Sequence, residues 1–162
     1  MSLGNNVRVD DFAILSGEIS IGDYVHISAG VKLYAVAGLR IGNFCGASPN
    51  STIYTASDDF SGNAMISPLV PEELTDVHKS AVIMEDYVQL GADSIVMPGV
   101  KLAEGSCTGA FTFVTKDLLP WSINIGIPCR FYKSRAQTAK ELSKKLEQTI
   151  FSGHNVITLP GG

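Results

Sequence analysis

Cysteine, histidine and charged residues are all scarce in this chain of 162 residues. It holds three cysteines and three histidines, only 17% of its residues are charged, and its formal net charge is −4. Cys45, Cys107 and Cys129 are odd in number, widely spaced and without a CxxC pair, which argues against a disulfide framework or a thiolate metal site. Without a basic block, the chain does not fit a protein whose main partner is nucleic acid.

Long apolar runs are absent as well. No run approaches the roughly 20 residues of a membrane-spanning helix. The N-terminus lacks a basic region followed by an apolar stretch. With 45% hydrophobic residues, the chain can bury one sizeable core. We therefore expect a single cytoplasmic domain that does not span a membrane.

What the chain does contain is a period of six residues. A helix would show a period near 3.6 and an amphipathic strand a period of 2, so neither fits. A fixed hexapeptide period predicts a parallel β-helix, in which three short strands make one turn of about 18 residues. The period slips by two residues near Leu39. The recurring positions are Val9, Leu15, Ile21, Ile27, Leu33, Ile41, Ala47 and Ile53, then Met84, Leu90, Val96, Leu102, Thr108 and Val114.

The segment 55–81 interrupts this period. It contains the run Ser57 to Gly62, which reads Ser-Asp-Asp-Phe-Ser-Gly, and two prolines, Pro68 and Pro71. A long irregular stretch inside a compact domain is usually functional. We expect a loop that protrudes from one corner of the β-helix.

The end of the chain changes character. Ser134 could cap a helix over 134–150, where Leu142, Leu146 and Ile150 recur every four residues. We expect that helix to cover one end of the β-helix. The predicted organisation is a β-helix domain over 1–133, the helix over 134–150 and a tail over 151–162.

Three segments in the second block of repeats resemble the hexapeptide-repeat acyltransferase superfamily, whose members are left-handed β-helix enzymes. Val88 to Val100 is similar to the family's V-W-I-G-A-G-A-x-I-x-P-G-V, and Gly109 to Asp117 resembles G-A-G-S-V-V-T-K-D. Ile125 to Arg130 resembles the x-G-x-P-A-[KR] that closes the coenzyme A site. The resemblance implies a left-handed parallel β-helix and a homotrimer, with each active site between neighbouring subunits.

The resemblance also implies acetyl-CoA as the acyl donor. The backbones of Ala92 and Ala110 would bind the pantetheine arm, and Lys116 would supply charge near the phosphates. Two departures, Gln89 for a Trp and Phe111 for a Gly, leave the preferred acyl group open. The predicted cofactor-binding residues are Gln89, Ala92, Gly109, Ala110, Thr115, Lys116, Pro128 and Arg130.

The catalytic base is harder to assign. Acyl transfer needs a base for the acceptor's proton and a donor for the developing oxyanion. Sugar O-acetyltransferases carry a His in the loop, but here Asp58 and Asp59 stand near its place. His26 matches the second His of the amino-sugar N-acetyltransferase pattern. We predict His26, Asp58 and Asp59 as catalytic residues, although the two Asp could instead cap local amides and His26 could be an ordinary surface residue.

The sequence therefore predicts an acetyl-CoA-dependent O-acetyltransferase acting on a sugar or sugar-nucleotide hydroxyl. The Ser-Asp-Asp-aromatic-Ser-Gly loop resembles chains tied to surface-polysaccharide assembly. An amino-sugar N-acetyltransferase and a trimeric scaffold that has lost its base are the alternatives. The γ-type carbonic anhydrases share the fold but bind zinc through three His. The spacing of His26, His78 and His154 does not match theirs, so we predict no metal.

Overall fold

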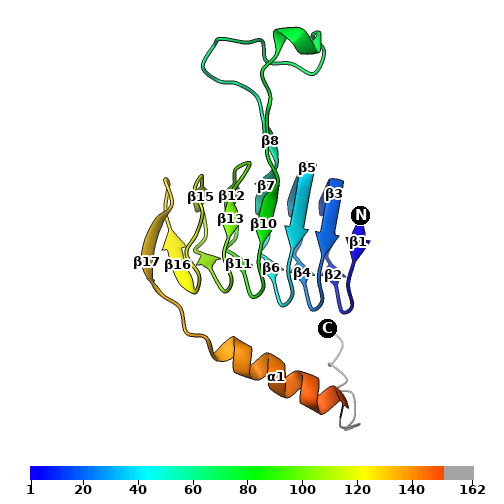
Figure 1. Ribbon diagram of the computed structural model, residues 1–162, viewed down its shortest axis with the longest axis vertical. Helices are drawn as coiled ribbons and strands as arrows, with labels where there is room; N and C mark the ends of the chain where they lie inside the picture. The colour runs from blue at the N-terminus through cyan, green and yellow to red at the C-terminus, as the bar shows by residue number, and fades with distance from the viewer. Residues whose placement is uncertain (152–162) are drawn as a thin grey trace.

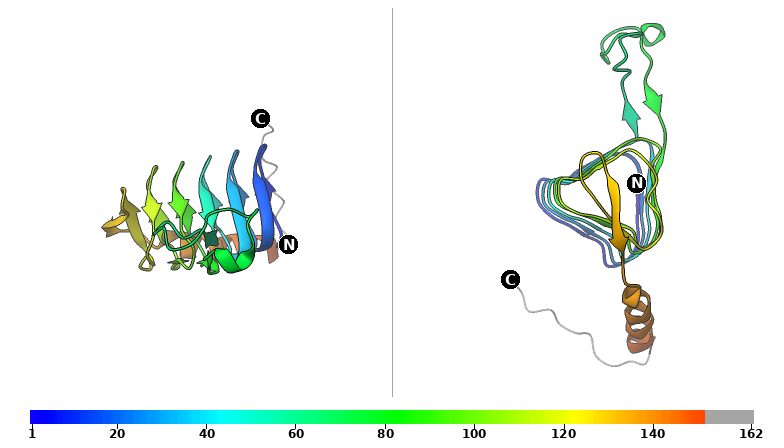
Figure 2. Two further views of the ribbon diagram at one scale, coloured as in Figure 1. Left: turned by 90° about the horizontal axis from the view of Figure 1, so that it is seen from above. Right: turned by 90° about the vertical axis from the view of Figure 1, so that its left-hand side faces the viewer.

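Short parallel strands stack turn upon turn in the computed structural model, which describes residues 1–151 (Figure 1). They form a β-solenoid of about six turns. Seen along its axis, the solenoid is a triangle from which a loop projects at one corner (Figure 2, right). The predicted parallel β-helix is therefore confirmed.

Each side of the triangle is a stack of strands, which we name after one member. The β4 face holds β2 (Arg8–Val9), β4 (His26–Ile27), β6 (Gly46–Ala47), β11 (Gln89–Leu90), β14 (Cys107–Thr108) and β16 (Ser122–Ile125). The β7 face holds the first parts of β3 (Ile14–Ile21) and β5 (Lys32–Ile41), with β7 (Thr52–Tyr54), β12 (Ile95–Val96) and β15 (Phe113–Val114). The β10 face holds β1 (Ser2–Leu3), the last parts of β3 and β5, β10 (Val82–Met84) and β13 (Lys101–Leu102).

Three corners join the faces. The alanine corner, between the β4 and β7 faces, includes residues 48–50, 91–93 and 109–111. The loop corner lies between the β7 and β10 faces and gives rise to the loop 55–81. The helix corner, between the β10 and β4 faces, lies beside α1 (Thr138–Phe151) (Figure 2, right).

The core is the inside of the triangle. Every predicted inward position from Ile21 to Val114 is buried, whereas Val9 in the first turn is 44% exposed. Burying an aliphatic side chain of this size contributes about 1.5–3 kcal/mol. The slip of the period is also real: β3 and β5 change register between Gly17 and Ile19, which is a bulge, and the inserted residues leave Leu39 buried at 4% exposure.

The loop 55–81 has structure of its own. Its base is an antiparallel pair, β8 (Ala56–Ser57) with β9 (His78–Lys79), and a short 3₁₀ helix, η1 (Glu72–Leu74), lies near its tip (Figure 1). Phe60, Met65 and Leu69 are exposed on it. The expected protrusion is present.

The C-terminal part differs from the expectation in two ways. Residues Arg130–Ser134 form β17, an antiparallel strand that pairs with β16, so α1 begins at Thr138 rather than at Ser134. The helix therefore does not cover the end of the solenoid, where β17 lies. It runs back beside the helix corner (Figure 1), because Arg135 and later residues bond to that corner. Of the predicted tail 151–162, Phe151 ends α1, while residues 152–162, with His154, and the side chains of Ile150 and Phe151 lie outside the described residues.

An aromatic ladder lines the helix corner. Tyr24, Phe44 and Tyr87 stack with ring centroids 5.0 and 5.3 Å apart, and the tilted ring of Trp121 follows at 5.7 Å from that of Tyr87. All four have a positive φ, which is the conformation of this tight corner. The hydroxyl of Tyr87 lies 2.7 Å from that of Ser143, which ties the ladder to α1.

Candidate active site

The alanine corner presents two free backbone donors in successive turns. Cross-turn hydrogen bonds build this corner: the amide of Asp93 donates to the Pro49 carbonyl at 3.0 Å, and that of Phe111 to the Ala92 carbonyl at 2.9 Å. The N–H groups of Ala92 and Ala110 find no acceptor within residues 1–151. Stacked turns are about 4.8 Å apart. Such a pair suits the amide carbonyls of an extended ligand, and pantetheine has two of them.

The other predicted cofactor residues frame this corner and its neighbour. Pro128 lies beyond the alanine corner in the last turn, and Arg130 begins β17. Thr115 and Lys116 lie at the loop corner, directly after β15. All four are exposed, so the Lys116 and Arg130 charges are accessible to an anionic ligand. In the last turns of the solenoid, Pro128 and Arg130 thus lie toward one edge of the β7 face, and Thr115 and Lys116 lie at the other. Their role in binding stays a prediction.

His26 lies in β4 and is paired with the carboxylate of Asp10. Its Nε2 is 2.7 Å from Oδ2 of Asp10, and Arg8 Nε donates to Oδ1 of the same carboxylate at 2.6 Å. These contacts, that of His26 first, lower the pKa of Asp10. An ionised Asp10 holds the His26 ring in one orientation. Sequence reasoning missed Asp10, although the 18-residue turn that aligns Arg8 with His26 could have found it.

Asp58 and Asp59 differ sharply despite being adjacent. Asp59 accepts hydrogen bonds from the amide and hydroxyl of Ser61, at 2.8 and 2.7 Å. Those bonds lower its pKa, so Asp59 serves as a local turn cap and is a poor base. The Asp58 carboxylate has no hydrogen bond within residues 1–151. It lines a hollow of about 660 Å³ between the loop and β5, together with Val36, Glu72, Asp76 and Lys79.

These parts do not meet within one chain. His26 is on the β4 face, the free amides are at the alanine corner, and Asp58 is on the loop at a different corner (Figure 2, right). The expected set of catalytic and donor-binding residues is therefore spread over the surface of the chain.

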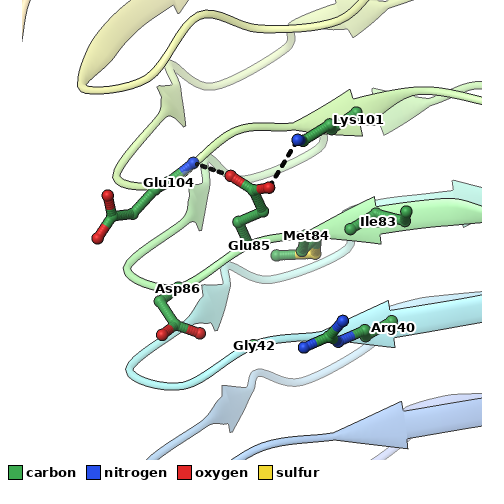
Figure 3. A pocket seen from close by; sticks show the side chains of 8 residues that line it. All are labelled: Arg40, Gly42, Ile83, Met84, Glu85, Asp86, Lys101 and Glu104. Carbon is green, nitrogen blue, oxygen red and sulfur yellow. Dashed lines mark hydrogen bonds and ion pairs between the residues drawn. The ribbon is translucent and has the colours of Figure 1, made fainter.

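A second hollow lies on the β10 face, where no residue was predicted. Its volume is about 360 Å³, and Arg40, Glu85 and Lys101 line it (Figure 3). Glu85 pairs with Lys101 at 2.7 Å and accepts the amide of Glu104 at 2.9 Å, and the bond to Lys101 is the first cause of its lowered pKa. Because both of its carboxylate oxygens are engaged, Glu85 is a structural ion-pair member.

Among residues 1–151, no three His, Cys, Asp or Glu side chains gather in a group that could hold a metal ion. The one α-helix in that part of the chain lacks the length and the apolar character needed to cross a membrane.

Comparison with known proteins defines the class. No family model matches the chain. It is 37% identical over 145 residues, 88% of its length, to the dTDP-4-amino-4,6-dideoxy-D-glucose acyltransferase of Escherichia coli, of which it covers 76%. The chain belongs to the hexapeptide-repeat acyltransferase family. The predicted family and the acyltransferase prediction are therefore confirmed.

Two further relatives give detail. AntD of Bacillus cereus, an N-acyltransferase solved with dTDP and 3-hydroxybutyryl-CoA, superposes with a TM-score of 0.91 at 40% identity, over 93% of this chain and 80% of its own. Galactoside O-acetyltransferase of Lactococcus lactis is 31% identical over 111 residues, 68% of this chain and half of that protein. The relatives thus include both N- and O-acyltransferases that act on sugars.

Proposed function

We propose that this enzyme transfers an acyl group from acyl-CoA to the amino group of a nucleotide-linked amino sugar. The observation that carries the proposal is the likeness to AntD, which spans nearly the whole chain. A second AntD structure, solved with dTDP-4-amino-4,6-dideoxyglucose and coenzyme A, covers 91% of this chain and 90% of its own, with a TM-score of 0.88 at 34% identity. The free amides of Ala92 and Ala110 support acyl-CoA as the donor.

The chemistry of the loop favours an amine over a hydroxyl. A sugar hydroxyl needs a strong base to become a nucleophile, and the loop His that serves O-acetyltransferases is absent. An amine whose pKa lies near 8, like that of an α-amino group, is partly neutral at physiological pH. It needs a base only after it has attacked. A carboxylate such as Asp58, free of hydrogen bonds among the described residues, is adequate for that step.

The amine, the thioester and Asp58 together account for every bond and proton in the acyl transfer. The neutral amine attacks the thioester carbonyl carbon, which forms the C–N bond and places a negative charge on the carbonyl oxygen. Asp58 takes the proton from the nitrogen. The C–S bond then breaks, and the departing thiolate takes that proton back from Asp58. The products are an amide and free CoA, and the enzyme is unchanged.

A homotrimer would bring the parts together. In this arrangement Asp58, on the loop of one subunit, faces the alanine corner of its neighbour. The separation of these groups within one chain supports this assembly, because a single subunit holds only half of the machinery. The cytoplasmic location and the role in surface-polysaccharide assembly expected from the sequence belong to the same proposal.

A hydroxyl acceptor is the second candidate. The likeness to galactoside O-acetyltransferase favours it, and so does the Asp10–His26 pair, which has the arrangement of an oriented base. The sequence-based prediction of O-acetylation is this case.

A thiol-release assay tests both. The donors are acetyl-CoA and 3-hydroxybutyryl-CoA, and the acceptors are dTDP-4-amino-4,6-dideoxyglucose, the matched 4-hydroxy nucleotide sugar, and a simple galactoside. We expect release of CoA with the amino sugar, and mass spectrometry should show an amide. Release with the hydroxy sugars alone would select O-acylation. Binding of CoA without release from any acceptor would contradict the proposal and favour a scaffold.

A further inference from the structure

The first turn of the solenoid leaves one end of the core exposed. Val9 occupies an inward position there but is 44% exposed, whereas Ile27, its partner one turn later, is 0% exposed. Leu3 and its partner Ile21 show the same contrast, at 52% and 3%. At the opposite end, β17 pairs with β16. The first turn therefore presents an apolar surface that residues 1–151 do not cover.

The strand edges of the first turn are also unpaired. Among residues 1–151, β1 pairs only with β3, and β2 pairs only with β4. Arg8 and Asp10 each donate their amide to a carbonyl of the second turn at 2.9 Å, so the N–H and C=O of Val9 between them face the other way, out of the solenoid. A free edge of this kind is a site at which another strand can pair.

The helix α1 leads the chain back to this end. Arg135, just before α1, bonds to the Tyr87 carbonyl, and three turns separate Tyr87 from the first turn by way of Phe44 and Tyr24. Three turns take about 14 Å. A helix of 14 residues is about 21 Å long, which is enough to return to the first turn. Figure 1 and the left view of Figure 2 show α1 ending beside that end of the solenoid.

The sequence that follows α1 has the pattern of a solenoid strand. Residues 157–161 read Ile-Thr-Leu-Pro-Gly, and residues 95–99 read Ile-Val-Met-Pro-Gly. The first two residues of the second run form β12, in which Val96 is buried, and Gly99 takes a φ of 79° at the corner that follows. Threonine is accepted at an inward position, as buried Thr108 shows. Residues 156–159 carry no charge.

We propose that residues 156–159 add a parallel strand to the free edge of β2 in the same chain and so cover the exposed end of the core. Thr158, the counterpart of Val96, lies over Val9 in this pairing, and Ile157 is aligned with Arg8. The edge is that of β2 because β2 begins at the helix corner, beside which α1 lies. The eleven residues 152–162 span up to about 36 Å when extended, which is ample for this path.

Hydrogen exchange of the full 162-residue chain tests the proposal. Mass spectrometry with electron-transfer fragmentation reads single amides. We expect the amides of Val9, Ile157 and Leu159 to exchange at least ten times more slowly than those of an unstructured peptide. Ile157→Pro removes a donor of the added strand and should restore fast exchange at Val9. His154→Pro, the same substitution before the strand, is the matched control and should leave Val9 protected.

A substitution on the other side of the contact gives the reciprocal test. Val9→Asp places a carboxylate beneath the added strand and should speed exchange at Ile157 and Leu159 at least tenfold. Ile14→Asp is its control, because Ile14 has nearly the same exposure in the same turn but lies on the β7 face. Slow exchange at Ile157 that Val9→Asp does not change would place the strand elsewhere and overturn the proposal.

Two further results would overturn it. Fast exchange at Ile157 and Leu159 in the wild-type chain would show that no strand forms there. Protection of Val9 that survives Ile157→Pro and weakens on dilution, with a sedimentation mass that falls in Val9→Asp, would assign the edge to a second copy of the chain. Ile157→Pro and His154→Pro lie outside the described core, so they decide the question even if Val9→Asp does not fold.

Discussion

At the scale of single residues, the chemistry of a polar side chain depends on whether its atoms already form hydrogen bonds with neighbouring residues. Asp59 is occupied by Ser61, whereas the Asp58 carboxylate has no hydrogen bond among the described residues. The Ser48 oxygen accepts from Gln89, so its proton is left to donate. Residues of one type therefore acquire different reactivity from their immediate surroundings.

The adjacent aspartates provide a matched pair of variants. Asp58→Asn should lower kcat by roughly 10²- to 10⁴-fold, the usual contribution of a general base, with a smaller effect on the KM values. Asp59→Asn should lower kcat less than tenfold, because the amide oxygen can still cap the turn. Steady-state kinetics with the amino sugar measures both. Equal losses in the two variants would show that the loop as a whole, rather than the Asp58 carboxylate, matters.

Lys116 supplies a prediction for donor binding. Lys116→Ala should raise the KM for acyl-CoA more than it lowers kcat, because a phosphate contact is equally strong in the ground state and the transition state. Dephospho-CoA donors offer a cross-check, since they should discriminate less between wild type and variant if Lys116 contacts the 3′-phosphate. A donor KM unchanged by the substitution would place the nucleotide elsewhere.

The cysteines provide a test of burial that depends on pH. Burial raises the pKa of Cys45 to about 12, and partial burial also raises those of Cys107 and Cys129. At pH 8 the Cys45 thiol should therefore resist iodoacetamide until the protein unfolds, while the other two react slowly and faster as the pH rises. Peptide mass spectrometry measures the labelling. Rapid labelling of Cys45 in the native protein would contradict its place in the core.

At the scale of secondary-structure elements, the helix is attached at few points. Arg135 Nη1 donates to the carbonyls of Tyr87 and Gly105, at 2.8 and 2.9 Å. Lys140 pairs with Glu104 at 2.8 Å and lies over the Trp121 ring. These contacts connect α1 to the helix corner, far from the alanine corner and the loop corner (Figure 2, right).

Arg135→Ala should consequently loosen α1 without affecting catalysis. It leaves two carbonyls without charge-assisted donors, which costs about 1–3 kcal/mol at this corner. We expect faster proteolysis within residues 136–151 and an unchanged kcat. Lys144→Ala, at an exposed helix position, is the control and should behave like wild type. Loss of activity in Arg135→Ala alone would mean that the helix contributes to the active site.

At the scale of the whole molecule, the β-solenoid is a rigid prism that keeps its corners apart. The β7 face separates the loop base from the alanine corner. Because the core inside the triangle is closely packed, the solenoid cannot bend to bring these two corners together. In the proposed homotrimer, chemistry that needs both corners would use two subunits.

Mixed oligomers test this directly. Asp58→Asn removes the proposed base and Ala110→Pro removes one of the proposed donor-binding N–H groups, so each variant alone is expected to have little activity. Co-expressed in equal amounts, they should recover about a quarter of wild-type activity, because one site in four would combine an intact Asp58 with an intact Ala110 N–H from its neighbour. Activity no higher than the mean of the two variants would show that each site is complete within one chain. Analytical ultracentrifugation of the mixture checks that trimers form.

The sequence by itself determined the regular part of this protein. A six-residue period repeats only if every turn buries the same positions, so the core, the slip at Leu39 and the protruding loop could be read from spacing alone. The family motifs likewise identified Ala92, Ala110 and Lys116 as candidates for donor binding. The end of the chain was less predictable, because β17 forms by pairing with β16 and no local signal marks it.

Only the tertiary structure decided how the polar side chains are paired. Asp10 meets the His26 ring, Gln89 the Ser48 hydroxyl, and Arg135 the backbone carbonyl of Tyr87, at separations of 16, 41 and 48 residues. Each pair meets because turns or elements are stacked side by side. Asp58 and Asp59 differ because Ser61, two residues along the loop, caps Asp59, whereas Asp58 faces a hollow that the loop forms with Val36. A period fixes which residues point inward, but hydrogen bonds across turns fix what the outward residues can do.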